Sequence, residues 1–181
     1  MRLFVAIEID AEIRKRIEEF VSRLKPTVAN VRWVRPEGMH ITLKFLGNVA
    51  DEREPSIEHA LRRIQAARFS ITVHKIGVFP NPKSPRVLWA GTEAGPEMAH
   101  LAERVDEQMA DLGFDREKRA FAPHITLARF GERRKEANLS SVLSDPQHSF
   151  GTMTTKEFHL YQSKLSPQGS RYSKLGSFAL L

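Results

Sequence analysis

The sequence predicts an α+β fold built from two similar halves that face each other across a central cleft. Three observations lead to this prediction: extended and helical apolar patterns are interspersed, one tetrapeptide occurs twice, and the segments around its two copies align without a gap. We expect antiparallel sheets lining the cleft, with helices outside them. The chain is expected to form a single bilobal domain over residues 1–181, with repeat units at roughly 2–47 and 86–130.

The first half opens with a predicted strand over residues 2–9, which alternates in polarity and is rich in β-branched and aromatic residues. Asp10 follows at a position suited to a helix N-cap, and apolar residues then recur at helical spacing. Pro26 ends this predicted helix. Two more strands are predicted over 31–35 and 40–47, joined by a turn that contains Pro and Gly.

The remainder of the chain alternates between helical and extended patterns. A second helix is predicted to open near Asp51 and Pro55, and a third to end near Gly113. A proline-rich loop over 80–85 is the clearest boundary between the two halves. The other expected strands lie at 69–79, 86–93, 122–130, 150–162 and 172–180, with a short helix at 137–144. The total is about eight strands and three or four helices.

Composition and charge restrict the possible functions. The 181 residues are 41% hydrophobic and 28% charged, with a net charge of +6, which favours a polyanionic partner such as nucleic acid. On charge alone, a basic surface that only confers solubility is an equal alternative. The chain has no cysteine, which excludes disulfides, thiolate metal sites and cysteine nucleophiles. No apolar segment approaches the ~18 residues of a membrane span, so we expect a soluble, cytoplasmic protein.

An internal repeat organises the chain. The tetrapeptide His-Ile-Thr-Leu occupies residues 40–43 and again 124–127, an offset of 84 residues (124 − 40). The same offset aligns the strand at 2–6 with that at 86–90 and brings apolar residues of the two following helices into register. Any two strand–helix–strand units resemble each other to some extent, but two identical motifs in register favour a true repeat with one motif in each half.

The repeated tetrapeptide has the composition of a phosphate-transfer site. In a strand, alternate side chains share a face, so His40 and Thr42 are expected to point together into the cleft, as are His124 and Thr126. An imidazole transfers protons near neutral pH, and a threonine hydroxyl donates to a phosphate oxygen. Two histidines on opposite sides of one phosphorus would supply the base and the acid of an in-line displacement, with a bell-shaped pH dependence.

The sequence shows no sign of a metal or of a nucleotide-driven reaction. The other five histidines lack a threonine two places on, and none forms an H-x-H or H-E-x-x-H pair. A Gly-x-x-x-x-Gly-Lys loop is also absent. We therefore expect neither a metal nor a cofactor.

These motifs make a family resemblance recognisable over nearly the full length. The chain resembles the two-histidine phosphoesterase superfamily, and most of all its bacterial and archaeal RNA 2′,3′-cyclic phosphodiesterases, historically called 2′-5′ RNA ligases. The matching stretches are Arg32-Trp33-Val34, His40-Ile41-Thr42-Leu43-Lys44-Phe45-Leu46-Gly47, Phe121-Ala122-Pro123-His124-Ile125-Thr126-Leu127-Ala128-Arg129, the opening Arg2-Leu3-Phe4-Val5-Ala6-Ile7, and Ser163-Lys164-Leu165 with Gly169 and Tyr172.

The resemblance implies a bilobal α+β fold and hydrolysis of a 2′,3′-cyclic phosphate on RNA to a 2′-phosphomonoester. It implies that His40 is the proton donor, that His124 is the proton acceptor, and that Thr42 and Thr126 hold the phosphate. The residues alone do not distinguish the two histidines, because their motifs are identical. The expected partner is RNA with a 2′,3′-cyclic phosphate end or a cyclic nucleotide, bound by a monomer.

Three further residues are candidates for substrate binding. Arg129 matches an arginine that the family places near the phosphate, but strand parity puts it on the wrong face unless the strand bulges or ends before it. Phe45 and Trp33 could stack on a base, with core packing as the alternative for each. Lys44 could belong to a basic rim or be an ordinary surface lysine.

Three alternative functions stay open. The chain could be a related phosphodiesterase acting on a 2′-5′ linkage or a small cyclic nucleotide. It could bind a terminal phosphate on RNA without turning it over. It could also join 2′-5′ ends by the reverse reaction, which water disfavours without an energy source.

Overall fold

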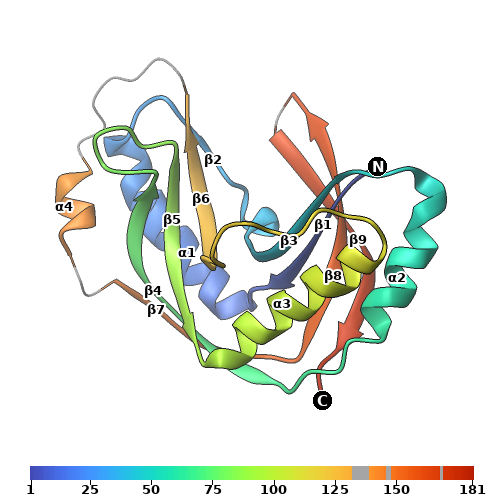
Figure 1. The fold of residues 1–181 in the computed structure, drawn as a ribbon. Coiled ribbons are helices and arrows are strands. Elements are labelled where there is room, and N and C mark those ends of the chain that lie inside the picture. Colours follow the sequence, from blue (N-terminus) through green and yellow to red (C-terminus); the bar gives the residue numbers. More distant parts are fainter. Residues whose placement is uncertain (132–138, 146–147, 168) are drawn as a thin grey trace.

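The computed structural model describes residues 1–131, 139–145, 148–167 and 169–181 (Figure 1). Its strands are β1 (Arg2–Glu8), β2 (Val31–Trp33), β3 (His40–Asn48), β4 (Phe69–Phe79), β5 (Val87–Ala94), β6 (His124–Phe130), β7 (Ser149–Thr155), β8 (Glu157–Ser166) and β9 (Gly169–Ala179). Its α-helices are α1 (Ala11–Leu24), α2 (Glu54–Arg62), α3 (Pro96–Asp111) and α4 (Ser140–Leu143), and short 3₁₀ helices are η1 (Lys25–Thr27), η2 (Pro36–Gly38) and η3 (Asp51–Arg53).

The strands of the described part of the chain form one antiparallel sheet in the order β7-β4-β5-β6-β3-β1-β8-β9, with β2 beside β6. The middle of this sheet is a narrow seam, because β3 and β6 pair only through Ile41 and Ile125. The two sheets expected from the sequence are therefore two halves of one sheet, which turn toward each other on either side of the seam (Figure 1). The α+β prediction is confirmed.

The two halves are related by a pseudo-two-fold axis that passes through the seam. Counting outward, β6, β5, β4 and β7 on one side correspond to β3, β1, β8 and β9 on the other. Ile41 and Ile125 are 84 residues apart and pair with each other, as equivalent residues do across a two-fold axis. The repeat recognised in the sequence is thus also a repeat in space, with one correction. Ala6 pairs with Thr42 and Trp89 pairs with Thr126, so the first strands of the two units align at an offset of 83 residues (89 − 6) and not 84.

The helices cross from one half to the other. Helix α1 follows β1 but contacts β7 in the opposite half, and α3 follows β5 but contacts β3. Figure 1 shows α3 running beside α2 along the half that contains β8 and β9. Each half of the sheet is therefore covered by a helix from the other repeat unit. That the chain forms a single bilobal domain stays a prediction.

Three element predictions need correction. The stretch 150–162 is not one strand, because the chain leaves β7 at Thr155 and enters β8 at Glu157, and these strands pair with β4 and β1 in opposite halves. The described part thus holds nine strands, one more than expected. The last strand begins at Gly169, before residue 172, and β2 ends at Trp33. Of the helix predicted at 137–144, residues 137 and 138 lie outside the described part.

Strand β1 lies at the centre of its half and is buried on both faces. Its odd-numbered residues, such as Val5 and Ile7, join the main core beneath the helices. Its even-numbered residues Phe4 and Ala6 form a small second core with Tyr161 on the cleft face. This second core supports the floor of the site described next. No helix in the ranges that the structure describes is long and apolar enough to cross a membrane.

Candidate active site

The two His-Ile-Thr-Leu motifs meet at the seam of the sheet. Ile41 faces Ile125, so the antiparallel pairing brings His40 toward Thr126 and Thr42 toward His124 on the opposite face. All four side chains line one pocket of about 580 Å³, which we call the central pocket. The structure thus brings together the four residues that the sequence singled out, in a space of the size that small ligands occupy.

The side chains around the motifs come from both halves. The remaining lining residues of the central pocket are Arg2, Leu3, Phe4, Arg32, Val34, Gly38, Phe45, Phe79, Val87, Arg129, Ser163, Leu165, Ser170 and Tyr172. None of them is acidic, and three are arginines.

Backbone carbonyls orient both imidazoles in the same way. The Nδ1 atom of His40 lies 2.7 Å from the Gly38 carbonyl oxygen, and Nδ1 of His124 lies 2.8 Å from the Ala122 carbonyl oxygen. A carbonyl oxygen only accepts hydrogen bonds, so Nδ1 carries the proton in each ring. Each Nε2 is then left to exchange a proton with a substrate, as acceptor when the ring is neutral and as donor when it is charged.

A β-bulge lies at the last residue of each motif, at the same position of the repeat. The register of β3 against β1 passes over Leu43, and that of β6 against β5 passes over Leu127. An extra residue reverses the parity of the strand, so Phe45 and Arg129 return to the face of the histidines. Both line the central pocket. The bulge that Arg129 required is confirmed, and Phe45 is its equivalent in the first repeat.

The two histidines have unequal surroundings. The ring of His40 is surrounded by Phe4, Tyr172 and Tyr161, with centroid distances of 4.7, 5.3 and 6.3 Å. Among the described residues His124 has one such contact, to Phe79 at 5.0 Å. The aromatic residues that enclose His40 come from β1, β8 and β9, which are outside the repeated tetrapeptide.

This enclosure changes the proton affinity of His40. Burial, which disfavours the charged imidazolium, is the largest cause that lowers the pKa of His40, to about 4. The hydrogen bond to the Gly38 carbonyl acts in the opposite direction, while the positive charge of Arg129 and the proximity of His124 lower the pKa further. In the free protein His40 is therefore neutral at pH 7.

Sequence reasoning missed two arginines of the pocket. Arg2 and Arg32 line it together with Arg129, and Arg32 lies directly opposite Arg129 in the β2–β6 pairing. Their only sequence signal was that they fall inside the stretches of family resemblance. Three guanidinium groups around two histidines make a site for a phosphate-bearing ligand.

A scan against protein families identifies the chain. The model of the LigT like Phosphoesterase family matches residues 7–89 and again residues 92–172. The chain belongs to this family. The resemblance drawn from the sequence is thereby confirmed, and each matched segment contains one of the two His-Ile-Thr-Leu motifs.

Named relatives of this LigT-like phosphoesterase agree with the assignment. The RNA 2′,3′-cyclic phosphodiesterase of Archaeoglobus fulgidus is 39% identical over 179 residues, covering 98% of this chain and 99% of the relative. Escherichia coli LigT crystallised with 3′-AMP superposes with a TM-score of 0.80 at 31% identity, covering 99% and 97% of the two chains. A protein from Thermus thermophilus superposes with a TM-score of 0.82 at 31% identity, covering 99% and 97%.

Two of the predicted substrate-binding residues lie in different places in this phosphoesterase. Phe45 lines the central pocket and is 65% exposed, so its ring is not used for core packing. Trp33 does not line the central pocket. It packs partly against the main core and lines a smaller groove next to the pocket.

Lys44 does not belong to a basic rim. Its side chain is buried, forms an ion pair with Asp106 of α3, and donates to the Asp115 carbonyl oxygen at 2.8 Å. Asp106 also accepts from the Glu117 backbone N–H at 3.1 Å. Burial acts to raise the pKa of Asp106, but the hydrogen bonds and charge of its partners hold it below the ordinary value.

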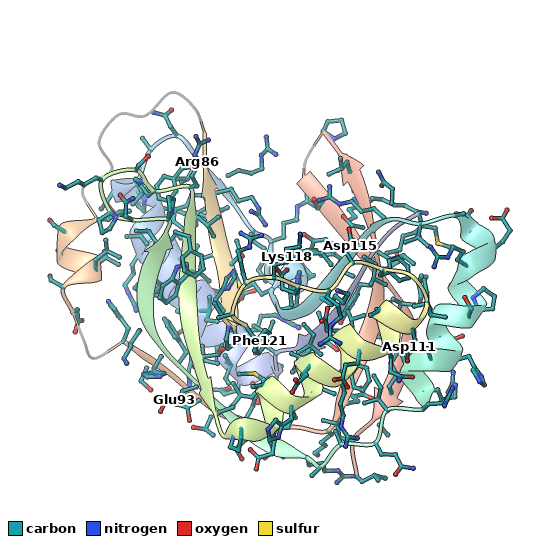
Figure 2. The ribbon with its side chains drawn as sticks, viewed as in Figure 1. Arg86, Glu93, Asp111, Asp115, Lys118 and Phe121 are labelled. Atoms are coloured by element: carbon teal, nitrogen blue, oxygen red, sulfur yellow. The ribbon has the colours of Figure 1, made fainter. Side chains whose placement is uncertain are left out.

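This ion pair fixes the connection that leads to the second motif. Figure 2 shows the chain running from Asp111 past Asp115 and Lys118 to Phe121, just before β6. Lys44 lies four residues after His40 in β3, so it joins the strand of the first histidine to the segment that precedes the second. No three His, Asp or Glu side chains cluster as metal ligands within the described ranges.

Proposed function

We propose that this chain hydrolyses the 2′,3′-cyclic phosphate end of RNA to a 2′-phosphomonoester by acid–base catalysis without a metal ion or cofactor. The observation that carries the proposal is the arrangement of His40 and His124 on one pocket, each with Nδ1 held by a carbonyl and Nε2 left for the substrate. The names of full-length relatives supply the substrate class. The two motifs supply groups for both proton transfers.

In the proposed mechanism, His124 is the proton acceptor and His40 the proton donor. His124 removes a proton from a water molecule, whose oxygen attacks phosphorus in line with the P–O3′ bond. That bond breaks, and His40 gives its proton to the departing O3′. The phosphate stays on O2′. Thr42 and Thr126 donate hydroxyl hydrogen bonds to the non-bridging oxygens.

The arginines have an electrostatic role in this mechanism. Negative charge on the non-bridging oxygens persists through the displacement, and Arg129 lies close enough to affect the pKa of His40 in the same pocket. A fixed guanidinium beside that charge stabilises the transition state without reorganising. Phe45, exposed at the pocket wall, offers a face on which the terminal base stacks.

His40 can act as the proton donor only if substrate binding raises its pKa. In the empty pocket its pKa is about 4, so the ring has no proton to give at pH 7. A bound cyclic phosphate brings a negative charge that favours the imidazolium and offsets Arg129. His40 then gains its proton together with the substrate.

The first test is product analysis. The purified protein is incubated with a nucleoside 2′,3′-cyclic phosphate in the presence of EDTA, and the product is identified by comparison with authentic 2′- and 3′-monophosphates. We expect full activity and a 2′-phosphate. A 3′-phosphate product would reject the assignment of the leaving oxygen, and loss of activity on chelation would reject the metal-independent mechanism.

The second test assigns the two proton transfers. In His40→Ala the remaining histidine acts as base and must be deprotonated, so residual kcat/KM should rise with pH. In His124→Ala the remaining histidine acts as acid and must be protonated, so residual kcat/KM should fall as pH rises. Each variant should lose about 10²–10⁴-fold in rate. If residual kcat/KM instead falls with pH in His40→Ala and rises with pH in His124→Ala, His40 is the proton acceptor and His124 the proton donor.

Other functions make different predictions in the same assays. A phosphodiesterase for 2′-5′ linkages would cleave 2′-5′ oligoadenylate in preference to the cyclic phosphate. A binding module would show affinity without turnover, and a ligase would join 2′-5′ ends. A cytoplasmic location and a monomeric state are further predictions, and light scattering after size-exclusion chromatography tests the second.

A further inference from the structure

A smaller groove opens from the central pocket beside β2. It has a volume of about 100 Å³, against about 580 Å³ for the central pocket. Arg35 and Trp33 line the groove but not the central pocket, whereas Arg32, Arg129 and Tyr172 line both spaces. The groove is therefore a continuation of the central pocket, and it is too small for a nucleoside but large enough for a phosphate-sized group.

The groove is cationic. Arg32 lies opposite Arg129 in the β2–β6 pairing, an arrangement that costs stability because like charges face each other. Neither of these two side chains has a hydrogen-bond or ion-pair partner among the described residues, so the facing pair is best balanced by an anion from outside the chain. Arg35 adds a third guanidinium, and no Asp or Glu is among the lining residues of the groove.

We propose that the groove binds a second phosphate of the substrate, the one attached to O5′ of the ribose that carries the cyclic phosphate. This inference rests on the proposed function. Arg32 and Arg35 are its ligands, because their planar guanidinium groups match the geometry of phosphate oxygens. Arg129, which lines both spaces, lies between the two phosphates and faces the reacting one.

The chemistry of the substrate supports this assignment. A ribose held by its 2′,3′-cyclic phosphate in the central pocket extends away from the reacting phosphorus only through its base and its O5′ substituent. Phe45 offers an apolar face for the base, and the groove offers cations for the other group. The second phosphate is either a free 5′-monophosphate or the phosphodiester of a longer RNA strand, and both present the anionic oxygens that the groove recognises.

The test compares three substrates that carry the same nucleobase beside the cyclic phosphate. They are the nucleoside 2′,3′-cyclic phosphate, the same molecule with a 5′-phosphate, and a dinucleotide ending in the cyclic phosphate. We expect kcat/KM to be at least about tenfold higher for the second and third, mainly through KM, because charge-assisted contacts are worth that much. The advantage should shrink as salt concentration rises.

Variants locate the contact. Arg35→Gln, at a residue that lines only the groove, should reduce the advantage of the two phosphorylated substrates to a few-fold or less. Arg32→Gln should reduce it as well and, because Arg32 also lines the central pocket, should lower kcat/KM for all three substrates. Arg23→Gln, an exposed arginine at the end of α1, is the matched control and should retain it. Unfolding midpoints confirm that each variant is folded, and the salt dependence of the wild-type protein gives an independent measurement if one is not.

The outcomes separate this inference from the proposed function. Equal kcat/KM for the three substrates, or an Arg35→Gln variant that lowers all three in proportion, would overturn the inference while leaving the hydrolysis intact. An advantage for the dinucleotide alone would assign the contact to the added nucleoside and also overturn it. No turnover of any substrate would overturn the proposed function and this inference together.

Discussion

Phe4 packs against His40 with ring centroids 4.7 Å apart, whereas Val87 occupies the equivalent place in the second repeat, because Phe4 pairs with Phe45 and Val87 pairs with Arg129. The repeat therefore preserves the motifs and changes what surrounds them. Burial by the aromatic rings is what lowers the pKa of His40 to about 4. Neighbours outside the two identical tetrapeptides therefore set the proton affinity of His40, which its motif alone does not determine.

Replacing Phe4 by Val, the residue at the equivalent place in the second repeat, should make the surroundings of the first histidine more like those of the second. We expect the pKa of His40 to rise from about 4 toward its ordinary value near 6.5, because water gains access to the ring. Titration of the imidazole proton signals by NMR measures this shift directly. An unchanged pKa in a folded variant would show that Phe4 is not the group that controls it.

Gly38 leaves little room for a side chain. A Cβ atom at this position would lie 3.0 Å from Cε2 of Tyr172, whose ring also packs on His40. Since the Gly38 carbonyl orients His40, we expect Gly38→Ala to lower kcat by about 10- to 100-fold through misplacement of the imidazole. Glu37→Ala, at an exposed position of the same 3₁₀ turn, should keep wild-type kcat.

Removing the charge of Lys44 should destabilise the fold. In Lys44→Met the largely buried Asp106 keeps Arg116 but loses its buried partner. We expect a loss of about 3 kcal/mol in the free energy of unfolding, measured with urea. Lys15→Met, at an exposed position on α1, removes the same charge and should change stability by less than about 0.5 kcal/mol. Similar losses in both variants would contradict the anchoring role.

Stability should fall under mildly acidic conditions. Burial, the largest cause in both, lowers the pKa of His40 and of His159 in the folded state. Below about pH 6.5 the unfolded chain binds protons that these folded histidines do not. The free energy of unfolding should therefore decrease by up to about 1.4 kcal/mol per pH unit for each histidine as pH falls, toward pH 4 for His40. His40→Ala should show a weaker decrease between pH 6.5 and 5 in urea titrations.

The crossed helices predict that both halves unfold together. Because α1 contacts β7 and α3 contacts β3, neither repeat can open without exposing the core of the other. Urea denaturation followed by tryptophan fluorescence and by circular dichroism should give coincident single transitions. Separate midpoints for the two probes would argue for two independently folding domains and against the single bilobal domain.

The site was predictable from the sequence because its signal is local. Two identical tetrapeptides in strands fix the side-chain parity of His40, Thr42, His124 and Thr126, and the parity of Arg129 demanded the bulge that is observed. Nothing in this argument needed knowledge of which strands are neighbours.

The rest depends on contacts between distant segments. The apolar stripe of α1 shows that one face is buried but not which strand buries it, so the crossing of the helices was not foreseen. Lys44 resembles a surface lysine until Asp106, 62 residues later, is placed beside it. Tyr172 reaches His40 from the other end of the chain, and only the pairing of β8 with β1 brings its hairpin there.

The bulges have a consequence for stereochemical choice. A cleft with two interchangeable imidazoles would accept a five-membered cyclic diester in either of two opposed orientations, and each would release a different hydroxyl. Phe45 and Arg129 stand at corresponding sites of the two repeats, yet one is apolar and the other cationic. This difference makes the two ends of the cavity unlike, so a cyclic diester binds better in one orientation than in the other. The residues that break the internal symmetry therefore select which ribose oxygen leaves.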